Sequence, residues 1–566
     1  MRSFDPDPGV TVIGPSGQRV HRRSVEQRAR LERQLYAVRP GVWCLVGNGL
    51  SNQTFVEGPG GLIVIDTGES VEEMRAALVE LRLHTQKPIV AVIYTHFHYV
   101  SGTRAVFDEV GGAVPVYGHH GISVNLARTG GEIAPAYASG LIHQFGIRLP
   151  DDGPDGLHDV GLGQTFRNLA HAPFTPGHAP TSVAWRGGET AEIAGLRVEV
   201  SHAPSDSDDS ITLWFPDLRV AVQNLVWPTL FNIFAIRGEE YRNPQIVLRG
   251  IDHLLQLGCE HMIGTHGPPL SGVAEIAQRT TRYRDAIQFL WDQTVRGLNR
   301  GLTADQLAES VVLPASCDED YLTSEFYGVA EHHVRQIAAG TRGWFDGDPA
   351  KLFPLAPAER AGRLVSGFGG PAAVHAQLRS ARAANDLRWA LELGSWLAAR
   401  PGADAADRQA QADVLRDVAA RTSAANIRNW CLTKARDIDG CTDLSRQRTH
   451  RLRVDALLAG TPHAALNLLR VLLDPARANG IDHHIAFRLD QHQTVGLHVR
   501  NSVAVVTNGA GAESTVELSW SDLAAFLAGQ CELVDLADRS AVAITGNRAE
   551  IGRTLRCFDR GTQTKR

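Results

Sequence analysis

The strongest local signal in the sequence is Tyr94-Thr95-His96-Phe97-His98-Tyr99-Val100-Ser101-Gly102. It directly follows Pro88–Tyr94, an apolar run that predicts a buried strand. Two histidines at positions i and i+2 beyond the end of a strand can both turn toward one point. Neutral imidazole is a common protein ligand for zinc and similar metals. Taken alone, the pair is equally compatible with two exposed turn histidines, so its surroundings decide the interpretation.

The segments around this pair alternate between strand and helix patterns. Leu62–Gly68 is a β-branched run that ends in a turn, and Val71–Leu83 has the apolar spacing of a helix. Strand, helix and strand within about forty residues predict an α/β layer fold. Further along, residues 105–200 are expected to alternate short strands with long glycine-rich loops.

Composition limits the class of protein. The chain has 566 residues with a net charge of −6, so it has several domains and no basic field that would hold nucleic acid. Its apolar runs are too short to cross a bilayer, and its first thirty residues contain no apolar core of a secretory signal. Seven scattered cysteines without a C-x-x-C pair argue against a disulfide framework. We therefore expect a cytoplasmic protein.

Changes in pattern divide the chain into four parts. Residues 1–34 are an Arg-rich arm, 35–272 an α/β domain, 273–435 a helical domain, and 440–566 a small α+β domain. Within the last two, Tyr283–Thr294 and Leu452–Leu473 have helical patterns.

Two later motifs give the histidine pair a context. His202–Ser210 opens a strand pair, and Gly264–Pro269 follows the last strand of the α/β domain. In this order the motifs resemble the metallo-β-lactamase fold, an αββα sandwich whose ligands lie on loops at one edge. The resemblance implies that His96 and His98 are the first two metal ligands. It places Asp206 in the third motif and His266 at the last ligand.

Longer segments resemble one branch of that fold, the alkylsulfatases. Leu230–Gly238 is similar to the segment in which Asn232 and Arg237 would hold the sulfate. Phe326–His333 and Gly343–Pro349 are similar to segments of the alkylsulfatase dimerisation domain, and the last domain resembles their sterol-carrier-like domain. The resemblance implies a homodimer built through the helical region. It also implies that Tyr327 and His332 close the pocket, where either could protonate a leaving oxygen.

The chain departs from the family pattern at the second metal subsite. Val100 and Ser101 stand where the family has Asp and His, Asn224 replaces an acidic bridging ligand, and Phe231 replaces a histidine. Valine cannot coordinate a metal, and a neutral amide does not offset a second dication. We therefore expect one divalent metal per chain, with zinc favoured and iron as the alternative.

Three functions remain open from the sequence. The leading hypothesis is a metal-dependent hydrolase of a sulfate ester, or of a similar anionic ester, that carries an apolar tail. The alternatives are a mononuclear non-haem iron oxygenase that uses the same residues and a non-catalytic protein that binds an amphiphile. A degenerate site that holds no metal is a further possibility.

Four residues near the predicted site carry separate expectations. Asp208 and Asp209 are candidates for a ligand or a base, or for a solvated turn. His178 competes with the Asp206 loop for the third motif, and the loop is favoured. Arg237 is expected to be exposed, so that its removal would cost little stability.

Overall fold

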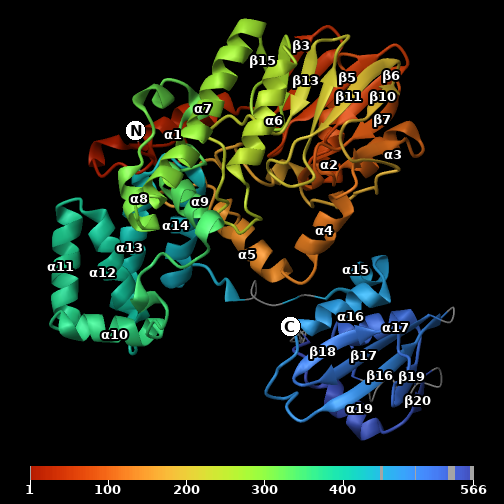
Figure 1. Ribbon diagram of the computed structural model, residues 1–566, viewed down its shortest axis with the longest axis vertical. Coiled ribbons are helices and arrows are strands. Elements are labelled where there is room, and N and C mark those ends of the chain that lie inside the picture. The colour runs from red at the N-terminus through yellow and green to blue at the C-terminus, as the bar shows by residue number, and fades with distance from the viewer. Residues whose placement is uncertain (1, 446–449, 451, 491–492, 533–541, 561–566) are drawn as a thin grey trace. The chain divides into compact units, whose positions relative to one another are not determined.

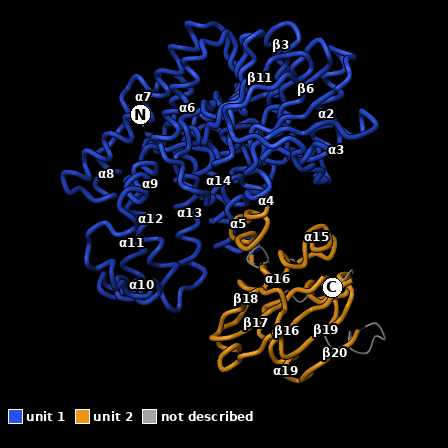
Figure 2. The backbone as a smooth tube through the Cα atoms, turned by 45° about the vertical axis from the view of Figure 1, so that its right-hand side comes forward, with its two compact units in different colours: residues 1–126, 139–444 blue, residues 127–138, 445–566 orange. Residues whose placement is uncertain are grey.

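The computed structural model describes residues 2–445, 450, 452–490, 493–532 and 542–560. Parts of the predicted arm and of the predicted C-terminal domain lie outside these ranges. The chain forms two compact units, residues 1–126 with 139–444 and residues 127–138 with 445–566 (Figure 2). The domain boundaries derived from the sequence stay a prediction.

Unit 1 contains two packed sheets, shown in Figure 1. The first sheet has seven strands in chain order: β3 Gln34–Arg39, β4 Val42–Val46, β5 Gln53–Gly58, β6 Gly61–Ile65, β7 Ile89–Ile93, β8 Val116–His119 and β9 Val183–Trp185. The second has six, also in chain order: β10 Thr190–Ile193, β11 Leu196–His202, β12 Ile211–Phe215, β13 Val220–Gln223, β14 His261–Gly264 and β15 Leu270–Ser271.

Apolar side chains hold the layers together. Ile63 and Ile93 of the first sheet share a core with Val200 and Leu213 of the second. The outer face of the first sheet packs on helices α2 (Val71–Leu81) and α3 (Thr103–Val110), and α6 (Pro244–Gln256) and α7 (Val273–Leu298) share a core with residues of the second sheet. The buried apolar residues therefore lie between the layers of the predicted αββα sandwich.

The parallel strands β6, β7 and β8 end at one edge of the first sheet. Side chains that follow such strands converge there, as expected for a site at the carboxyl edge of a parallel sheet. The histidine pair begins immediately beyond β7.

The prediction for residues 105–200 is wrong in part. The structure has three helices between residues 103 and 144: α3, α4 (Ile122–Gly130) and α5 (Ala134–Gln144). All three helices are short, and the Gly130-Gly131 pair at the end of α4 matches a loop pattern although only three residues separate α4 from α5. The Leu452–Leu473 helix is also two helices, α15 (Val454–Ala459) and α16 (Pro462–Arg470), because Pro462 starts a new helix capped by Thr461.

Further helices complete unit 1, and the N-terminal residues pair with it. The helices are α1 Arg22–Arg30, α8 Ala304–Ser310, α9 Ala330–Arg342, α10 Pro357–Gly367, α11 Pro371–Ala383, α12 Leu387–Ala399, α13 Ala405–Arg421 and α14 Ala425–Ile438. Strands β1 (Thr11–Ile13) and β2 (Arg19–His21) form a two-stranded sheet, and Phe4 makes a β-bridge with Thr422.

Unit 2 is an α+β unit around one sheet in the order β18-β17-β16-β19-β20. Its strands are β16 Asp482–Arg488, β17 Thr494–Arg500, β18 Val503–Thr507, β19 Ser514–Glu517 and β20 Ala543–Thr545. Helices α15, α16, α17 (Trp520–Leu527) and α19 (Arg548–Leu555) share its apolar core. Among the described residues, no helix is long and apolar enough to cross a bilayer.

Candidate metal centre and anion site

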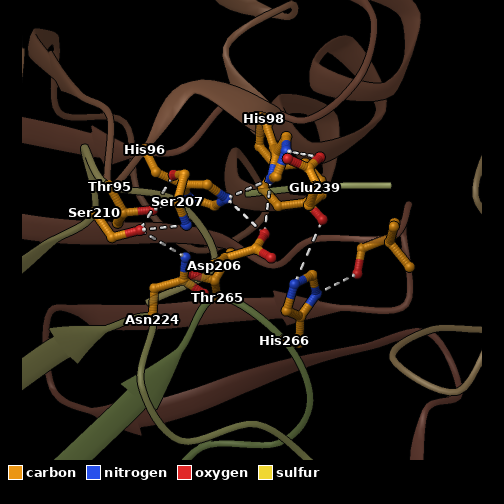
Figure 3. Close-up of polar contacts among 12 residues, drawn as sticks. Thr95, His96, His98, Asp206, Ser207, Ser210, Asn224, Glu239, Thr265 and His266 are labelled. Atoms are coloured by element: carbon orange, nitrogen blue, oxygen red, sulfur yellow. Dashed lines mark hydrogen bonds and ion pairs between the residues drawn. The ribbon is translucent and has the colours of Figure 1, made fainter. Parts of the chain in front are cut away.

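Three side chains predicted as ligands meet beyond the sheet edge. His96 and His98 follow β7, and Asp206 lies on the loop between β11 and β12 (Figure 3). His98 Nδ1 lies 2.7 Å from Asp206 Oδ2 and 3.1 Å from His96 Nε2, and His96 Nε2 lies 3.3 Å from the same carboxylate oxygen. Among the described residues, this is the one group of three such side chains close enough to share an ion.

A hydrogen-bond chain sets the tautomer of His96. The Thr95 hydroxyl lies 2.7 Å from Asp66 Oδ2 and 3.0 Å from His96 Nδ1. Because Thr95 donates its single proton to the Asp66 carboxylate, it accepts the proton on His96 Nδ1. His96 Nε2 therefore presents a lone pair to His98 and Asp206. Asp66 was not predicted as a site residue.

Arg242 orients the carboxylate of Asp206. Its guanidinium bonds Asp206 Oδ1, and its Nε donates to the Asp206 backbone oxygen at 3.0 Å. Burial by itself would raise the pKa of Asp206, but Arg242 and His98 outweigh it and hold that pKa well below its usual range. Asp206 is therefore a buried anion with Oδ2 turned toward the histidines. Arg242 was not predicted as a site residue.

This donor set fits a divalent transition metal. Ligands about 2.0–2.1 Å from a tetrahedral ion lie roughly 3.3 Å apart. His96 Nε2 lies 3.1 Å from His98 Nδ1 and 3.3 Å from Asp206 Oδ2, close to that value, and the separation of His98 Nδ1 from Asp206 Oδ2 is shorter at 2.7 Å. Two imidazoles and one carboxylate suit zinc with an open position, or Fe(II) in a facial triad. Ligand type alone does not separate the two metals.

Asn232 and Arg237 both lie buried on the segment after β13. The Asn232 side chain is 1% exposed, and neither its Oδ1 nor its Nδ2 has a hydrogen-bond partner. A buried amide without partners is costly and is typical of a site that awaits a ligand. Arg237 is 9% exposed, so the expectation that it is exposed is wrong.

Glu239 explains the burial of Arg237. The carboxylate of Glu239 accepts hydrogen bonds from Arg237 at 2.9 and 3.2 Å and lies 3.5 Å from His98 Nε2. Burial would raise the pKa of Glu239, but Arg237 and His98 hold it well below its usual range. With a metal bound at Nδ1, the proton of His98 would lie on Nε2, where the Glu239 carboxylate is 3.5 Å away to accept it. Glu239 was not predicted.

Tyr327 belongs to the same neighbourhood, whereas His332 has no polar link to it. Tyr327 Oη accepts a hydrogen bond of 2.5 Å from Gln144 Nε2, and burial raises the pKa of Tyr327 to about 12 although Arg237 opposes the rise. The hydroxyl therefore keeps its own proton available. Among the described residues, His332 makes no hydrogen bond to the metal-ligand group; its ring lies edge-on to Phe234 at 6.1 Å.

The remaining candidates take other positions. Asp209 is buried, and its Oδ1 accepts from Ser207 while its Oδ2 has no partner. Asp208 Oδ1 accepts from Asn125 Nδ2 at 2.7 Å. His178 lies outside the metal-ligand group, with its ring 6.1 Å from that of Tyr94.

Comparison with known proteins identifies the family of this chain. It matches the metallo-beta-lactamase superfamily over residues 46–222, the alkyl sulfatase dimerisation family over 303–440 and the alkyl sulfatase C-terminal family over 452–564. It is 33% identical to a linear primary-alkylsulfatase of Pseudomonas sp., an alignment that covers 89% of this chain and 98% of that one. The chain belongs to the alkylsulfatase family.

Other alkylsulfatases are similar to this chain in sequence and in fold. An (R)-specific secondary-alkylsulfatase of Pseudomonas sp. is 28% identical over 93% of this chain and 80% of its own length. The solved structure of the stereoselective inverting sec-alkylsulfatase Pisa1 from Pseudomonas sp. superposes with a TM-score of 0.85. It has 27% identity and covers 96% of this chain and 87% of that one. The family and fold class predicted from the sequence are confirmed.

The residues predicted to lie at a second metal subsite make other interactions. Val100 is buried among apolar side chains next to α2 and α3. The Asn224 amide is 3.4 Å from Ser210 Oγ, and its Oδ1 accepts from Trp227 Nε1 at 3.1 Å. His266 Nδ1 donates to the Leu50 carbonyl at 3.0 Å, which leaves Nε2 as an acceptor 3.4 Å from the Tyr99 hydroxyl.

Proposed function

We propose that this chain hydrolyses alkyl sulfate esters with a single divalent metal held by His96, His98 and Asp206. The observation that carries the proposal is the position of Arg237, whose guanidinium nitrogen lies 3.5 Å from His98 Nε2 at the edge of the ligand group. The resemblance of Leu230–Gly238 to the sulfate-holding segment of the family supports the same assignment.

The ligand set supports one metal. His96, His98 and Asp206 supply three ligands for one ion. The other carboxylates beside them have their own contacts: Glu239 pairs with Arg237, Asp66 accepts from Thr95, and Asp209 accepts from Ser207. Zinc is the metal we favour, with iron as the alternative that elemental analysis would detect.

The side chains have separate roles in this proposal. The metal, when bound, would supply Lewis-acid polarisation of an ester oxygen or of water. Asn232 and Arg237 hold the sulfate oxygens, because a buried unpaired amide and a guanidinium are both suited to anionic oxygens. Tyr327, protonated at neutral pH, is placed to give its proton to a leaving oxygen. We retain His332 as a residue that closes the pocket, and His266 as a residue that contacts substrate or water.

The helical region is the proposed dimer interface. Trp344 and Phe353 are 71% and 94% exposed, and they lie within the part of the chain that matches the alkyl sulfatase dimerisation family. Large apolar side chains so exposed are typical of a surface that a partner covers. The occupant proposed here is a second copy of the chain.

The test is sulfate release from a linear alkyl sulfate by metal-loaded protein, followed by ion chromatography. We expect release that stops when the metal is chelated and returns when it is restored. The His96→Ala variant should release none. Release of an oxidised alkyl product with consumption of dioxygen would favour the iron oxygenase instead.

A further inference from the structure

The Glu239 carboxylate forms an ion pair with the Arg237 guanidinium. Arg237 donates to Glu239 Oε1 through two of its nitrogens, at 2.9 and 3.2 Å, and the Glu239 side chain is 4% exposed. Glu239 also lies 3.5 Å from His98 Nε2, so it stands beside the metal-ligand group (Figure 3). It is therefore in contact with both the arginine and a predicted metal ligand.

The backbone between the two residues is shaped to bring them together. Gly238 has φ +89°, a conformation that L side chains rarely adopt, and its N–H donates to the Ala235 carbonyl at 3.0 Å. The turn at Gly238 brings Arg237 and Glu239, two residues apart in sequence, into contact as a buried ion pair.

Unlike Arg237, the Asn232 side chain has no partner among the described residues. Its amide is buried on the same segment and both of its polar atoms lack partners, whereas Arg237 donates to Glu239 through Nε and one terminal nitrogen. Of the two groups assigned to the sulfate, one therefore waits for a ligand and the other already holds an anion of this chain.

We propose that Glu239 is an internal anion that competes with the substrate's sulfate for Arg237 and thereby sets the affinity and head-group preference of the site. The inference rests on the proposed function and deepens it. To bind, a sulfate head must take over the Arg237 bonds from Glu239, and the binding free energy is reduced by the cost of separating that pair. A substrate whose head offers more or better-placed oxygens than a carboxylate is favoured over one with a single acceptor.

The test measures binding without turnover. Inorganic sulfate and a linear alkylsulfonate, which has no ester bond to break, are titrated into metal-loaded protein by calorimetry in a low-salt chloride buffer. We expect Glu239→Gln to bind both probes at least about tenfold more tightly than the unmodified chain. Glu240→Gln, which removes the same charge from the exposed neighbouring residue, should leave both affinities within about twofold.

Kinetics and a double variant separate competition from a structural effect. With an alkyl sulfate, Glu239→Gln should lower KM at least fivefold. Adding Arg237→Gln to Glu239→Gln should abolish the gain in affinity. Glu239→Ala is measured alongside, with thermal melting of each variant, and should show the same gain, so the result does not depend on one variant folding.

The outcomes separate this inference from the proposed function. Tighter probe binding by Glu239→Gln without sulfate release from any variant supports the competition and contradicts the hydrolase. Equal affinities of Glu239→Gln, Glu239→Ala and the unmodified chain overturn the competition, whether or not sulfate is released. A gain in affinity that persists without Arg237 also overturns it.

Discussion

At the scale of single residues, two buried ion pairs organise the site. Arg242 fixes the carboxylate that faces the histidines, and Glu239 neutralises Arg237 beside them. Removing one partner of such a pair leaves an uncompensated buried charge, which costs roughly 3–5 kcal/mol. The thermal melting of each single variant is therefore measured, and the variants of the Arg237–Glu239 pair are compared with the double variant that removes both charges.

Arg242→Gln should weaken metal binding. Without the guanidinium, Asp206 loses the contacts that hold Oδ2 toward His96 and His98, and losing an outer partner of a metal ligand lowers affinity about 10–100-fold. Competition with a chromogenic chelator measures this, with Arg249→Gln, an exposed arginine on α6, as the matched control. An unchanged metal affinity would show that Arg242 does not position the ligand.

Arg237→Gln should reduce turnover, with a loss of about 2–4 kcal/mol in transition-state stabilisation. Because Glu239 is left unpaired, the single variant should also melt at a lower temperature, unlike the exposed arginine expected from the sequence. The Arg237→Gln/Glu239→Gln double variant should recover stability without recovering kcat/KM. Normal turnover by the stable double variant would refute the sulfate-holding role of Arg237.

At the scale of elements, helix α5 packs on the segment that carries Arg237. A Cβ on Gly140 would lie 2.0 Å from the Arg237 backbone oxygen, so only glycine allows this approach. The same helix ends in Gln144, which bonds Tyr327 and accepts from the Arg237 N–H at 3.3 Å. One short helix therefore positions two proposed site residues.

Gly140→Ala should force α5 and the Arg237 segment apart. Displacement of a binding group by about 1 Å can cost roughly 100-fold in rate, so we expect kcat/KM to fall about 10–100-fold while metal content is kept. Gly130→Ala is the control, since a Cβ there meets nothing within 4 Å. Equal kcat/KM values for the two variants would contradict this role of α5.

Elements with strong local patterns could be predicted from sequence, and the others could not. The β7 run and the histidines that follow it were predicted because apolar strands and the residues at their ends are local features. Helices α4 and α5 were missed because glycine pairs resemble loops. Glu239 was missed for a different reason: in the Glu239-Glu240 pair, only tertiary packing decides which carboxylate is buried against Arg237.

At the scale of the whole molecule, the fold brings distant segments to one point. His98 and Asp206 lie 108 residues apart in sequence, and Gln144 reaches Tyr327 across 183 residues. The family resemblance predicted that the metal ligands would lie together. It did not supply Arg242 or Glu239, because neither belongs to the motif that carried the resemblance.

The proposed homodimer leads to a prediction about the mass in solution. Light scattering at micromolar concentration should report twice the chain mass of 61.4 kDa, because an exposed apolar surface in the helical region needs a partner. Phe353→Ser should shift the protein toward the monomer, whereas Leu83→Ser, an exposed apolar residue just beyond α2, should not. A monomeric mass for the unmodified chain would rule out this interface.

The proposed site holds a single metal through two histidines and one aspartate. Elemental analysis of the purified chain is combined with a measurement of sulfate release from a linear alkyl sulfate. We expect one divalent metal per chain, lost with activity in His96→Ala and Asp206→Ala and retained in His266→Ala, since His266 is turned to Leu50 and Tyr99. Two metals per chain, or full activity without metal, would contradict it.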